Sequence, residues 1–514
     1  MTKLLIWLGA TVLVAGFLIL VLRQVFPLPD LTGRPHEAAL PPDSQSRIGR
    51  AFADRIAAHP GQTGIVALEN GHDALASRLA LIDMAETSID AQYYIWHDDT
   101  SGLLLLDTLY RAAQRGVRVR LLLDDNGIPG LDRLLASLNA QENFQVRLFN
   151  PSTVRHPKML GYAFDFFRMN RRMHNKSLIA DGTAAIIGGR NIGDEYFQIG
   201  NAFYLDTDAI AVGQVVPETI AAFDAYWNAA SVFELERVIP VKGDIAAFEA
   251  RITALRQTDA ARDLLDVVES SARAAIEGAI TYDWTRVQLV VDDPAKGQGI
   301  ATEDQLMISR LGQILGGIEA RLDLVSAYFV PGPRGTDAFA DLARRGVEVN
   351  ILTNALNTTD VLLVHAGYTK YRRALLEAGV RLFELKLRAN GAGPDRQIFP
   401  LGISGASLHA KTFAVDHRRV FIGSFNFDPR SADLNCEMGF LIDSPAMAAR
   451  LSLAFDHAIS LVSYQPALTP EKKMVWVEAL PQGASTIYQE EPDATWLRQI
   501  TLAIVAVLPV EWLL

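Results

Sequence analysis

The sequence predicts an α/β fold in which one sandwich domain is built twice, with pseudo-twofold symmetry between the copies and the functional site at their interface. Two observations predict the duplication: a strand–helix–strand order recurs in the second half, and the same polar motif follows at the matching point of each copy. A third observation, an apolar run close to the first residue, predicts one transmembrane helix ahead of the repeat.

Length and composition exclude several classes of protein. A chain of 514 residues that is 49% hydrophobic and 21% charged is long and apolar enough to bury the cores of several domains. A net charge of −11 argues against a protein that coats nucleic acid through its overall field. Because Cys436 is the only cysteine, an internal disulfide framework and a cysteine-rich zinc site are excluded.

The first element is the apolar run, which extends from Leu4 to Leu22 without a charged residue. Its length nearly matches the hydrocarbon thickness of a bilayer, about 30 Å. A signal peptide has a shorter apolar stretch and a small-residue cleavage site, whereas this run passes directly into Arg23. We therefore expect a single anchor over 1–22 in the cell inner membrane. The positively charged residues on the two sides of the run favour, by a small margin, a body on the cytoplasmic side. A proline-rich linker is expected over 23–45.

The repeat follows the linker. Its first copy reads SIDAQYYIW from Ser88, then a helical stretch and VRVRLLLD, and its second copy reads RLDLVSAYFV from Arg321, then a helical stretch and VEVNILTN. Gly116 and Gly346 stand where each helix would need a left-handed residue at its end. The expected order of parts is a first domain over 46–240, a helical connector over 241–280, a second domain over 281–465, and a C-terminal tail with an apolar helix over 466–514.

Each copy carries a polar motif with the same spacings. The first consists of His174, Lys176, Asp181 and Asn191, and the second of His409, Lys411, Asp416 and Asn426. Positions i and i+2 of a strand share a face, so each histidine projects together with its lysine. Two such units placed together provide cations for negative oxygens, a nucleophile, and an acid for a leaving alcohol. These are the groups that reaction at a phosphodiester requires.

The paired pattern resembles the phospholipase D superfamily, whose signature HxK(x)4D(x)6G(S/G)xN is found at 174–191 and 409–426. Further segments, among them QYYIWHDDTSG (92–102), NRRMHNKS (170–177) and the terminal LPVEWLL, resemble the bacterial cardiolipin synthases of the C type. The resemblance implies two phospholipase D-like domains, phospholipid substrates at a membrane, and a phosphohistidine intermediate formed without a metal or another cofactor.

The resemblance also implies roles for the motif residues. We assign His174 as the nucleophile and His409 as the general acid and then base, and the pseudo-twofold symmetry leaves the reverse assignment open. We expect Asp181 and Asp416, which the motif makes catalytic candidates, to fix their own turns. The groups expected to bind the phosphoryl oxygens are Lys176, Lys411, Asn191, Asn426 and Ser424, the last standing where the first motif has Gly189.

A histidine nucleophile needs its second ring nitrogen held, usually by a carboxylate. Asp206 and Glu437 follow the two motifs on strand-like runs, and relatives in the superfamily place an orienting carboxylate at these positions. The alternative for each is an ordinary surface position on a strand, and Asp208 competes with Asp206.

The predicted reaction is phosphatidyl transfer that forms cardiolipin, and three alternatives stay open. The same site suits hydrolysis of phospholipids to phosphatidic acid, the same motifs occur in nucleases and phosphodiesterases of the superfamily, and a noncatalytic membrane scaffold is a further possibility. The apolar anchor counts against a nucleic-acid substrate, so none is expected. The sequence is silent on a helper protein.

One segment next to the first motif has its own composition. Between Thr153 and Lys176, six basic residues are interleaved with aromatic ones against a single acid, Asp165. Such a segment suits either an interface that faces anionic lipid headgroups or a solvated loop with a few packed aromatic rings.

Overall fold

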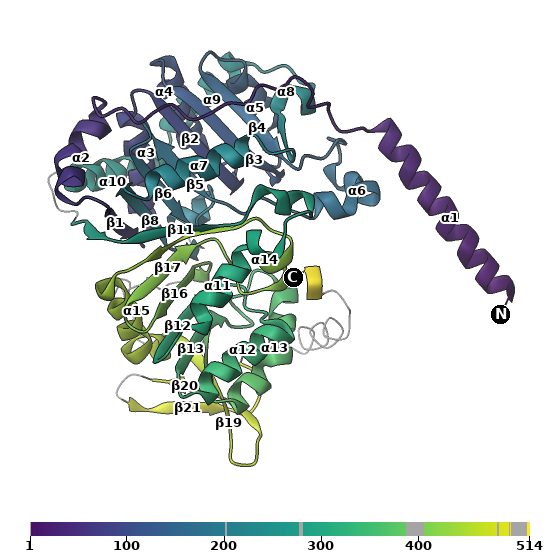
Figure 1. Ribbon diagram of the computed structural model, residues 1–514, viewed down its shortest axis with the longest axis vertical. Helices are drawn as coiled ribbons and strands as arrows, with labels where there is room; N and C mark the ends of the chain where they lie inside the picture. The colour runs from purple at the N-terminus through teal and green to yellow at the C-terminus, as the bar shows by residue number, and fades with distance from the viewer. Residues whose placement is uncertain are drawn as a thin grey trace.

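The computed structural model describes residues 2–200, 203–276, 281–386, 406–480, 483–492, 494 and 511–513. Two bodies, each a sheet with helices against it, lie one above the other (Figure 1). The first half of the chain builds the upper body and the second half the lower, while helix α1 (Thr2–Val25) projects to one side. The apolar helix predicted in the C-terminal tail, at 500–510, lies outside the described residues.

The upper body holds a sheet of nine strands among the described residues, in the order β10-β1-β8-β6-β5-β2-β3-β4-β9. Its strands are β1 (Thr63–Leu68), β2 (Ser88–Ile95), β3 (Arg118–Gly127), β4 (Phe144–Phe149), β5 (Ser177–Ala180), β6 (Ala184–Gly188), β8 (Asp208–Gly213), β9 (Val232–Glu234) and β10 (Asp283–Thr285). Its helices are α2 (Arg47–Ala58), α3 (Gly71–Met84), α4 (Thr100–Gln114), α5 (Asp132–Asn139), α6 (Tyr162–Met169), α7 (Val216–Trp227) and α8 (Leu235–Val238).

The lower body holds a sheet of ten described strands, in the order β11-β18-β17-β16-β12-β13-β14-β19-β20-β21. Its strands are β11 (Val287–Val291), β12 (Arg321–Ser326), β13 (Glu348–Asn354), β14 (Arg381–Leu385), β16 (Lys411–Val415), β17 (Arg419–Gly423), β18 (Met438–Ile442), β19 (Ser463–Leu468), β20 (Met474–Ala479) and β21 (Ser485–Tyr488). Its helices are α11 (Met307–Gly316), α12 (Gly332–Arg344), α13 (Leu362–Glu377), α14 (Pro429–Asp433), α15 (Pro445–His457) and α16 (Ile459–Val462).

The two sheets share one topology, which confirms the predicted α/β fold built twice. The run β8-β6-β5-β2-β3-β4 of the first sheet has the same order as β18-β17-β16-β12-β13-β14 of the second. In each run the last three strands are parallel and the others antiparallel, so both sheets are mixed. Gly116 and Gly346 end the helices of the two crossovers with φ of 92° and 90°, the left-handed conformation predicted for them.

The two bodies meet through apolar packing and through short strand pairs. One hydrophobic cluster draws on both sheets, with Ile187 and Ala209 from the first and Ile422 and Phe440 from the second. Strand β7 (Phe203–Leu205) of the first half pairs in parallel with β15 (Ala406–Leu408) of the second. A parallel bridge also joins Met173 to Cys436. These two connections fix the register of one half against the other.

The segments before the first sheet include a long apolar helix and a proline-rich stretch without helix or strand. The span Leu5–Val25 has a mean hydropathy of 2.7 and none of it is buried in the protein, so it is long and apolar enough to cross a bilayer, a test that a signal sequence passes as well. The proline-rich stretch after it lies against the first body, where Glu37 pairs with Arg147 at 3.0 Å.

Two expected domain boundaries do not coincide with the sheets. The boundary between 465 and 466 falls inside β19, and β20 and β21 continue the second sheet beyond it, because their backbone groups extend the same ladder. Strand β10, expected within the second domain, pairs with β1 of the first sheet. The predicted connector contains α9 (Ile245–Arg256) and α10 (Asp259–Ile276) in its described part.

Candidate active site

The first histidine lies at the point where the two halves bridge. Met173 is paired in parallel with Cys436, and the next residue, His174, donates its backbone N–H to the carbonyl of Cys436 at 2.8 Å. In a parallel bridge the following side chains of the two segments lie next to each other. His174 therefore meets Glu437, and its Nδ1 lies 2.8 Å from Oε2 of that carboxylate.

The second histidine is held in the same manner, but here the histidine belongs to the second half of the chain and its partners belong to the first. Leu408 of β15 is in register with Leu205 of β7, and His409 donates its backbone N–H to the carbonyl of Leu205 at 2.8 Å. Asp206 follows Leu205, and its Oδ2 lies 2.5 Å from Nδ1 of His409. Each imidazole is thus oriented by a carboxylate that belongs to the opposite half of the chain.

Both histidines and both lysines are buried in one centre. His174 and His409 are 6% and 5% exposed, and the ammonium groups of Lys176 and Lys411 donate to the backbone carbonyls of the histidines two residues before them. Burial lowers the pKa of each lysine below its usual value. The charges also act across the interface, because Lys411 lowers the pKa of His174 and Lys176 lowers the pKa of His409.

The pKa of both histidines is lowered, but by different balances of burial and charge. Burial, reinforced by Lys176 and Lys411, holds the pKa of His174 well below its ordinary value, so its imidazole is neutral near pH 7. Burial and Lys411 lower the pKa of His409 as well, but Asp206 opposes that shift. The pKa of Asp206 is itself lowered, because His409 and Lys411 outweigh the opposing effect of burial, whereas burial raises the pKa of Glu437. The second histidine therefore has the more strongly anionic partner.

The glycine-rich turns of the two motifs are not equivalent. Ser424 donates its hydroxyl to Oε2 of Glu437 at 2.5 Å, the same oxygen that faces His174. At the matching position, a Cβ on Gly189 would lie 2.1 Å from Oδ1 of Asp206, far inside van der Waals contact. The first motif therefore accommodates Asp206 only because residue 189 has no side chain.

The asparagines also differ in what they contact. The Asn191 side chain is committed within the first half: its Oδ1 accepts from the backbone N–H of Ile95 at 3.2 Å and its Nδ2 donates to the hydroxyl of Tyr196 at 3.0 Å. Asn426 is 3% exposed, and its Oδ1 has no hydrogen-bond partner in the described chain. The side-chain oxygen of Asn426 is thus less committed than that of Asn191.

Asp181 and Asp416 are not brought to the histidines. Asp181 stands after the far end of β5 with φ of 49°, and its carboxylate accepts from the backbone N–H groups of Glu86, Thr87 and Ser88 ahead of β2. Asp416, with φ of 51°, accepts in the same way from Ala320 and Arg321 ahead of β12. Both carboxylates tie a turn to the start of the central strand, so the structure gives them no contact with the reacting groups.

Aromatic rings line the centre, and the residue-by-residue reading of the sequence missed them. The ring of Tyr94 lies 5.0 Å from that of His174, while Tyr196 and Tyr204 lie 5.2 and 5.1 Å from His409. Tyr328 is 6.4 Å from His409, and its hydroxyl donates to Asp360 at 2.6 Å. The available signal was the placement of Tyr94 and Tyr328 at the ends of the two repeated central strands.

The resemblance to the superfamily implies no metal. In the described part of the chain, three side chains lie close enough together to hold a metal ion: the ligand atoms of His97, Asp99 and Glu195 are within 4.8 Å of one another. The three residues are half-buried, His97 and Glu195 form an ion pair at 3.1 Å, and neither motif histidine belongs to the group.

The chain is similar to several known proteins in sequence and in fold. The model of the family described as "Cardiolipin synthase, PLD-like domain" matches the chain twice, at residues 79–227 and 312–459. Cardiolipin synthase C of Escherichia coli is 43% identical over 91% of this chain and the whole of that relative. A cardiolipin synthase of Listeria welshimeri is 27% identical over 80% of the chain and 71% of its own length. The crystal structure of phosphatidylserine synthase from Haemophilus influenzae matches the fold with a TM-score of 0.55, at 13% identity, over 90% of this chain and 99% of that one.

Proposed function

The chain belongs to the phospholipase D superfamily, as a protein with two cardiolipin synthase-type domains, and from this premise we propose that it is a phosphatidyltransferase that forms cardiolipin from two phospholipids. The observation that carries the proposal is the crosswise pairing of His174 with Glu437 and of His409 with Asp206, which gathers two oriented imidazoles and two buried ammonium groups. The name of the Escherichia coli relative supports cardiolipin as the product.

In the first step, Nε2 of His174 attacks the phosphorus of a donor phospholipid. The bond from phosphorus to the headgroup oxygen breaks, and His409 gives its proton to that oxygen, so the headgroup alcohol leaves and the phosphatidyl group stays on His174. The depressed pKa of His174 supports its role as the nucleophile, since it is neutral near pH 7. Asp206 opposes the lowering of the pKa of His409 by burial and Lys411, which supports His409 rather than His174 as the group that carries the proton into this step.

In the second step, His409 has lost its proton and acts as the base. It takes the proton of a glycerol hydroxyl on a second lipid, phosphatidylglycerol, while that oxygen attacks the phosphorus and the bond to His174 breaks. Lys176, Lys411 and the Asn426 amide hold the phosphoryl oxygens in both steps. We assign Glu437 and Asp206 as positioning residues, Ser424 as the support of Glu437, and Asn191, Asp181 and Asp416 as parts of the frame.

The burial of both histidines favours transfer over hydrolysis, because a site that excludes water lets a lipid alcohol, rather than water, react with the phosphohistidine intermediate. The test uses the full-length protein in vesicles of phosphatidylglycerol and phosphatidylethanolamine, with lipid products separated after a fixed time. We expect cardiolipin. Phosphatidic acid alone would identify a hydrolase, and cleavage of DNA or RNA without lipid turnover would identify a nuclease.

The same vesicles test the two histidine roles. We expect His174→Asn to abolish a trapped phospho-enzyme and His409→Asn to let it accumulate, because the first variant lacks the nucleophile and the second lacks the base for the second step. Each variant should lower turnover by about 10²–10⁴-fold. The opposite trapping pattern would exchange the two roles.

For location, we propose that α1 is retained as a single anchor in the inner membrane and that the body lies on its cytoplasmic side. The fully exposed apolar span supports the anchor, and the basic residues near its C-terminal end, Arg23 and Arg34, support the orientation. Protease added to sealed inverted vesicles should digest the body. Digestion only in right-side-out spheroplasts would reverse the orientation, and a mature protein that begins after α1 would show cleavage.

A further inference from the structure

A second apolar surface lies next to α1, on the segment that precedes the first motif. In the 3-10 turn Lys158–Gly161 and in α6, Met159, Leu160 and Phe167 are 71%, 55% and 69% exposed. Trp512, which is 47% exposed, meets α6 through its ring contact with Phe166 at 6.2 Å. We call these four exposed side chains the apolar ridge: Met159, Leu160, Phe167 and Trp512. Large apolar side chains gathered on a surface mark a site of interaction.

Four of the six cations of this segment pair with acids of the protein. Lys158 and Arg155 both pair with Asp125, at 3.1 and 2.8 Å, and the Arg155 guanidinium is 9% exposed. Arg168 pairs with Asp165 inside the segment. Arg172, which is 1% exposed, pairs with Asp124 at 3.2 Å. These four cations are therefore paired with acids of the protein, which weakens the interpretation that the segment attracts anionic headgroups by charge. The large side chains that the segment exposes most are apolar, namely Met159, Leu160 and Phe167.

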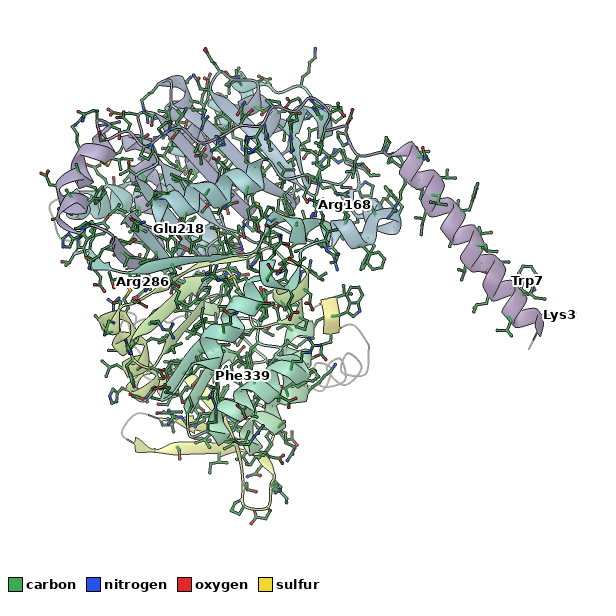
Figure 2. The ribbon with its side chains drawn as sticks, viewed as in Figure 1. Lys3, Trp7, Arg168, Glu218, Arg286 and Phe339 are labelled. Atoms are coloured by element: carbon green, nitrogen blue, oxygen red, sulfur yellow. The ribbon has the colours of Figure 1, made fainter. Side chains whose placement is uncertain are left out.

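The position of the ridge relative to a bilayer follows from α1. Arg23, the first charged residue after the apolar run, donates its Nε to the carbonyl of Phe164 at 2.9 Å and lies 3.7 Å from Asp165. Phe26 stacks on Phe164 with ring centroids 5.9 Å apart. Basic side chains at the end of a membrane-spanning helix reside in the headgroup layer. Helix α6 therefore sits at that level, as the nearness of Arg168 to the inner end of α1 illustrates, with Trp7 and Lys3 at the far end (Figure 2).

A short series of contacts connects the ridge to the reacting groups. In α6, the hydroxyl of Tyr162 donates to Oδ1 of Asn126 at 3.4 Å. Asn126 in turn acts on Tyr94, whose pKa it lowers against the larger raising effect of burial, and the Tyr94 ring lies 5.0 Å from that of His174. The chain itself passes from the end of α6 at Met169 to His174 within a few residues. A lipid whose acyl chains meet the ridge would carry its phosphate toward the first motif.

We propose that the apolar ridge is a second membrane contact, which inserts into the boundary between headgroups and acyl chains and turns the His174 side of the centre toward the lipid surface. The occupant is the bilayer, because the ridge is continuous with the anchor and lies at the headgroup level. The attachment comes from burial of apolar surface, so it is insensitive to salt. It does not depend on which reaction the centre performs.

The test measures the depth of a fluorescent probe in full-length protein reconstituted in phosphatidylglycerol–phosphatidylethanolamine vesicles. Cys436 is buried, and burial raises the pKa of its thiol to about 12, so a probe can be placed at an introduced cysteine without removing it. Phe167→Cys carries the probe on the ridge. Leu453→Cys is the matched control, since Leu453 is 54% exposed on α15 of the second half, away from α6.

We expect lipids with a nitroxide near the headgroup to quench the probe at position 167 several-fold more than the probe at position 453, with no change in 1 M NaCl. Nitroxides deep in the acyl chains should quench it less. Equal quenching at the two positions would overturn the proposal. Loss of quenching in salt would show electrostatic attachment and would overturn it too, as would shielding of position 167 that appears only at high protein-to-lipid ratio, the sign of a second copy on the ridge.

A kinetic arm shows whether the contact serves the reaction. Phe167→Asp should lower turnover of vesicle lipid by about tenfold, because a charge replaces a large apolar side chain at the boundary. Turnover of a short-chain phosphatidylglycerol dissolved as monomers should stay as in the parent, and Leu453→Asp should change neither rate. An equal fall in both rates would mean that Phe167 supports the fold and would overturn the proposal. The quenching result stands even if the product is not cardiolipin, so it separates failure of the ridge from failure of the proposed reaction.

Discussion

Replacing Glu437 by glutamine removes one negative charge from the centre and leaves the shape of the side chain. Oε2 of Glu437 lies 2.8 Å from Nδ1 of His174 and accepts the hydroxyl of Ser424 at 2.5 Å, so glutamine still fills the site. In the proposed mechanism, what disappears is the carboxylate that balances the positive imidazole formed when Nε2 bonds to phosphorus. We therefore expect Glu437→Gln to slow formation of the phospho-enzyme.

The magnitude follows from the type of hydrogen bond. A hydrogen bond to a charged group contributes about 1.5–3 kcal/mol, against about 0.5–1.5 kcal/mol for a neutral one. The difference of roughly 1–1.5 kcal/mol corresponds to about tenfold in rate. Because the interaction strengthens only as the histidine becomes cationic, kcat should fall and KM should stay near its parent value.

The assay is cardiolipin formation in vesicles, together with a rapid-quench measurement of phospho-enzyme. Glu384→Gln is the matched control: Glu384 is similarly buried in the same half, and its described partners, among them Arg372 at 3.0 Å and the Tyr368 hydroxyl, include neither His174 nor His409. This variant should lower the melting temperature and leave kcat of the folded fraction unchanged. A change in kcat below twofold for Glu437→Gln, or the same loss in both variants, would refute the reasoning.

Three further predictions follow from the geometry. Gly189→Ser forces Asp206 away from His409, because the new Cβ would lie 2.1 Å from Oδ1; kcat should fall by on the order of 10–100-fold, whereas Gly312→Ser, with nothing within 4 Å of its Cβ, should leave it unchanged. Because the pKa of His174 is depressed, kcat/KM should persist as the pH falls through 6.5 and be lost only at lower pH. Lys411→Met removes a cation that lowers this pKa, so the fall of kcat/KM on the acid side should move to higher pH. A pH profile whose acid side does not move would show that Lys411 does not influence His174. Asp181→Ala leaves three backbone N–H groups without their acceptor. It should reduce the free energy of unfolding, measured by denaturant titration, by about 1–3 kcal/mol and leave kcat of the folded protein unchanged. A selective loss of kcat would instead give Asp181 a chemical role.

Much of the fold was readable from local patterns. Alternating strands and helices, with Gly116 and Gly346 at helix ends, depend on residues close together in the chain, so their recurrence predicted two sheets of one topology. The expected end of the second domain at 465 was less successful. Strand β19 has a counterpart in β9, which pairs antiparallel with β4 as β19 does with β14, but β20 and β21 have none among the described strands, so the repeat carried no signal for those two.

Surface composition was less informative than it looked. The basic residues between Thr153 and Lys176 suggested attraction to anionic lipid, but their partners Asp124 and Asp125 come from the end of β3, and the pairing depends on how the segment folds back. Charge in the sequence does not reveal whether a cation faces solvent or an internal acid. The difference between Gly189 and Ser424 was visible, but its cause, the closeness of Asp206, was not.

The sequence by itself determined the duplicated α/β fold, the two motifs and the four groups of the centre, because each is encoded in spacings of a few residues along a strand or turn. Only the tertiary structure decided that the carboxylates serve the histidines of the opposite halves. Glu437 is 263 residues from His174 and Asp206 is 203 residues from His409, and over such separations chain spacing carries no information about contact. The parallel pairing of β7 with β15, and of Met173 with Cys436, brings each partner into place.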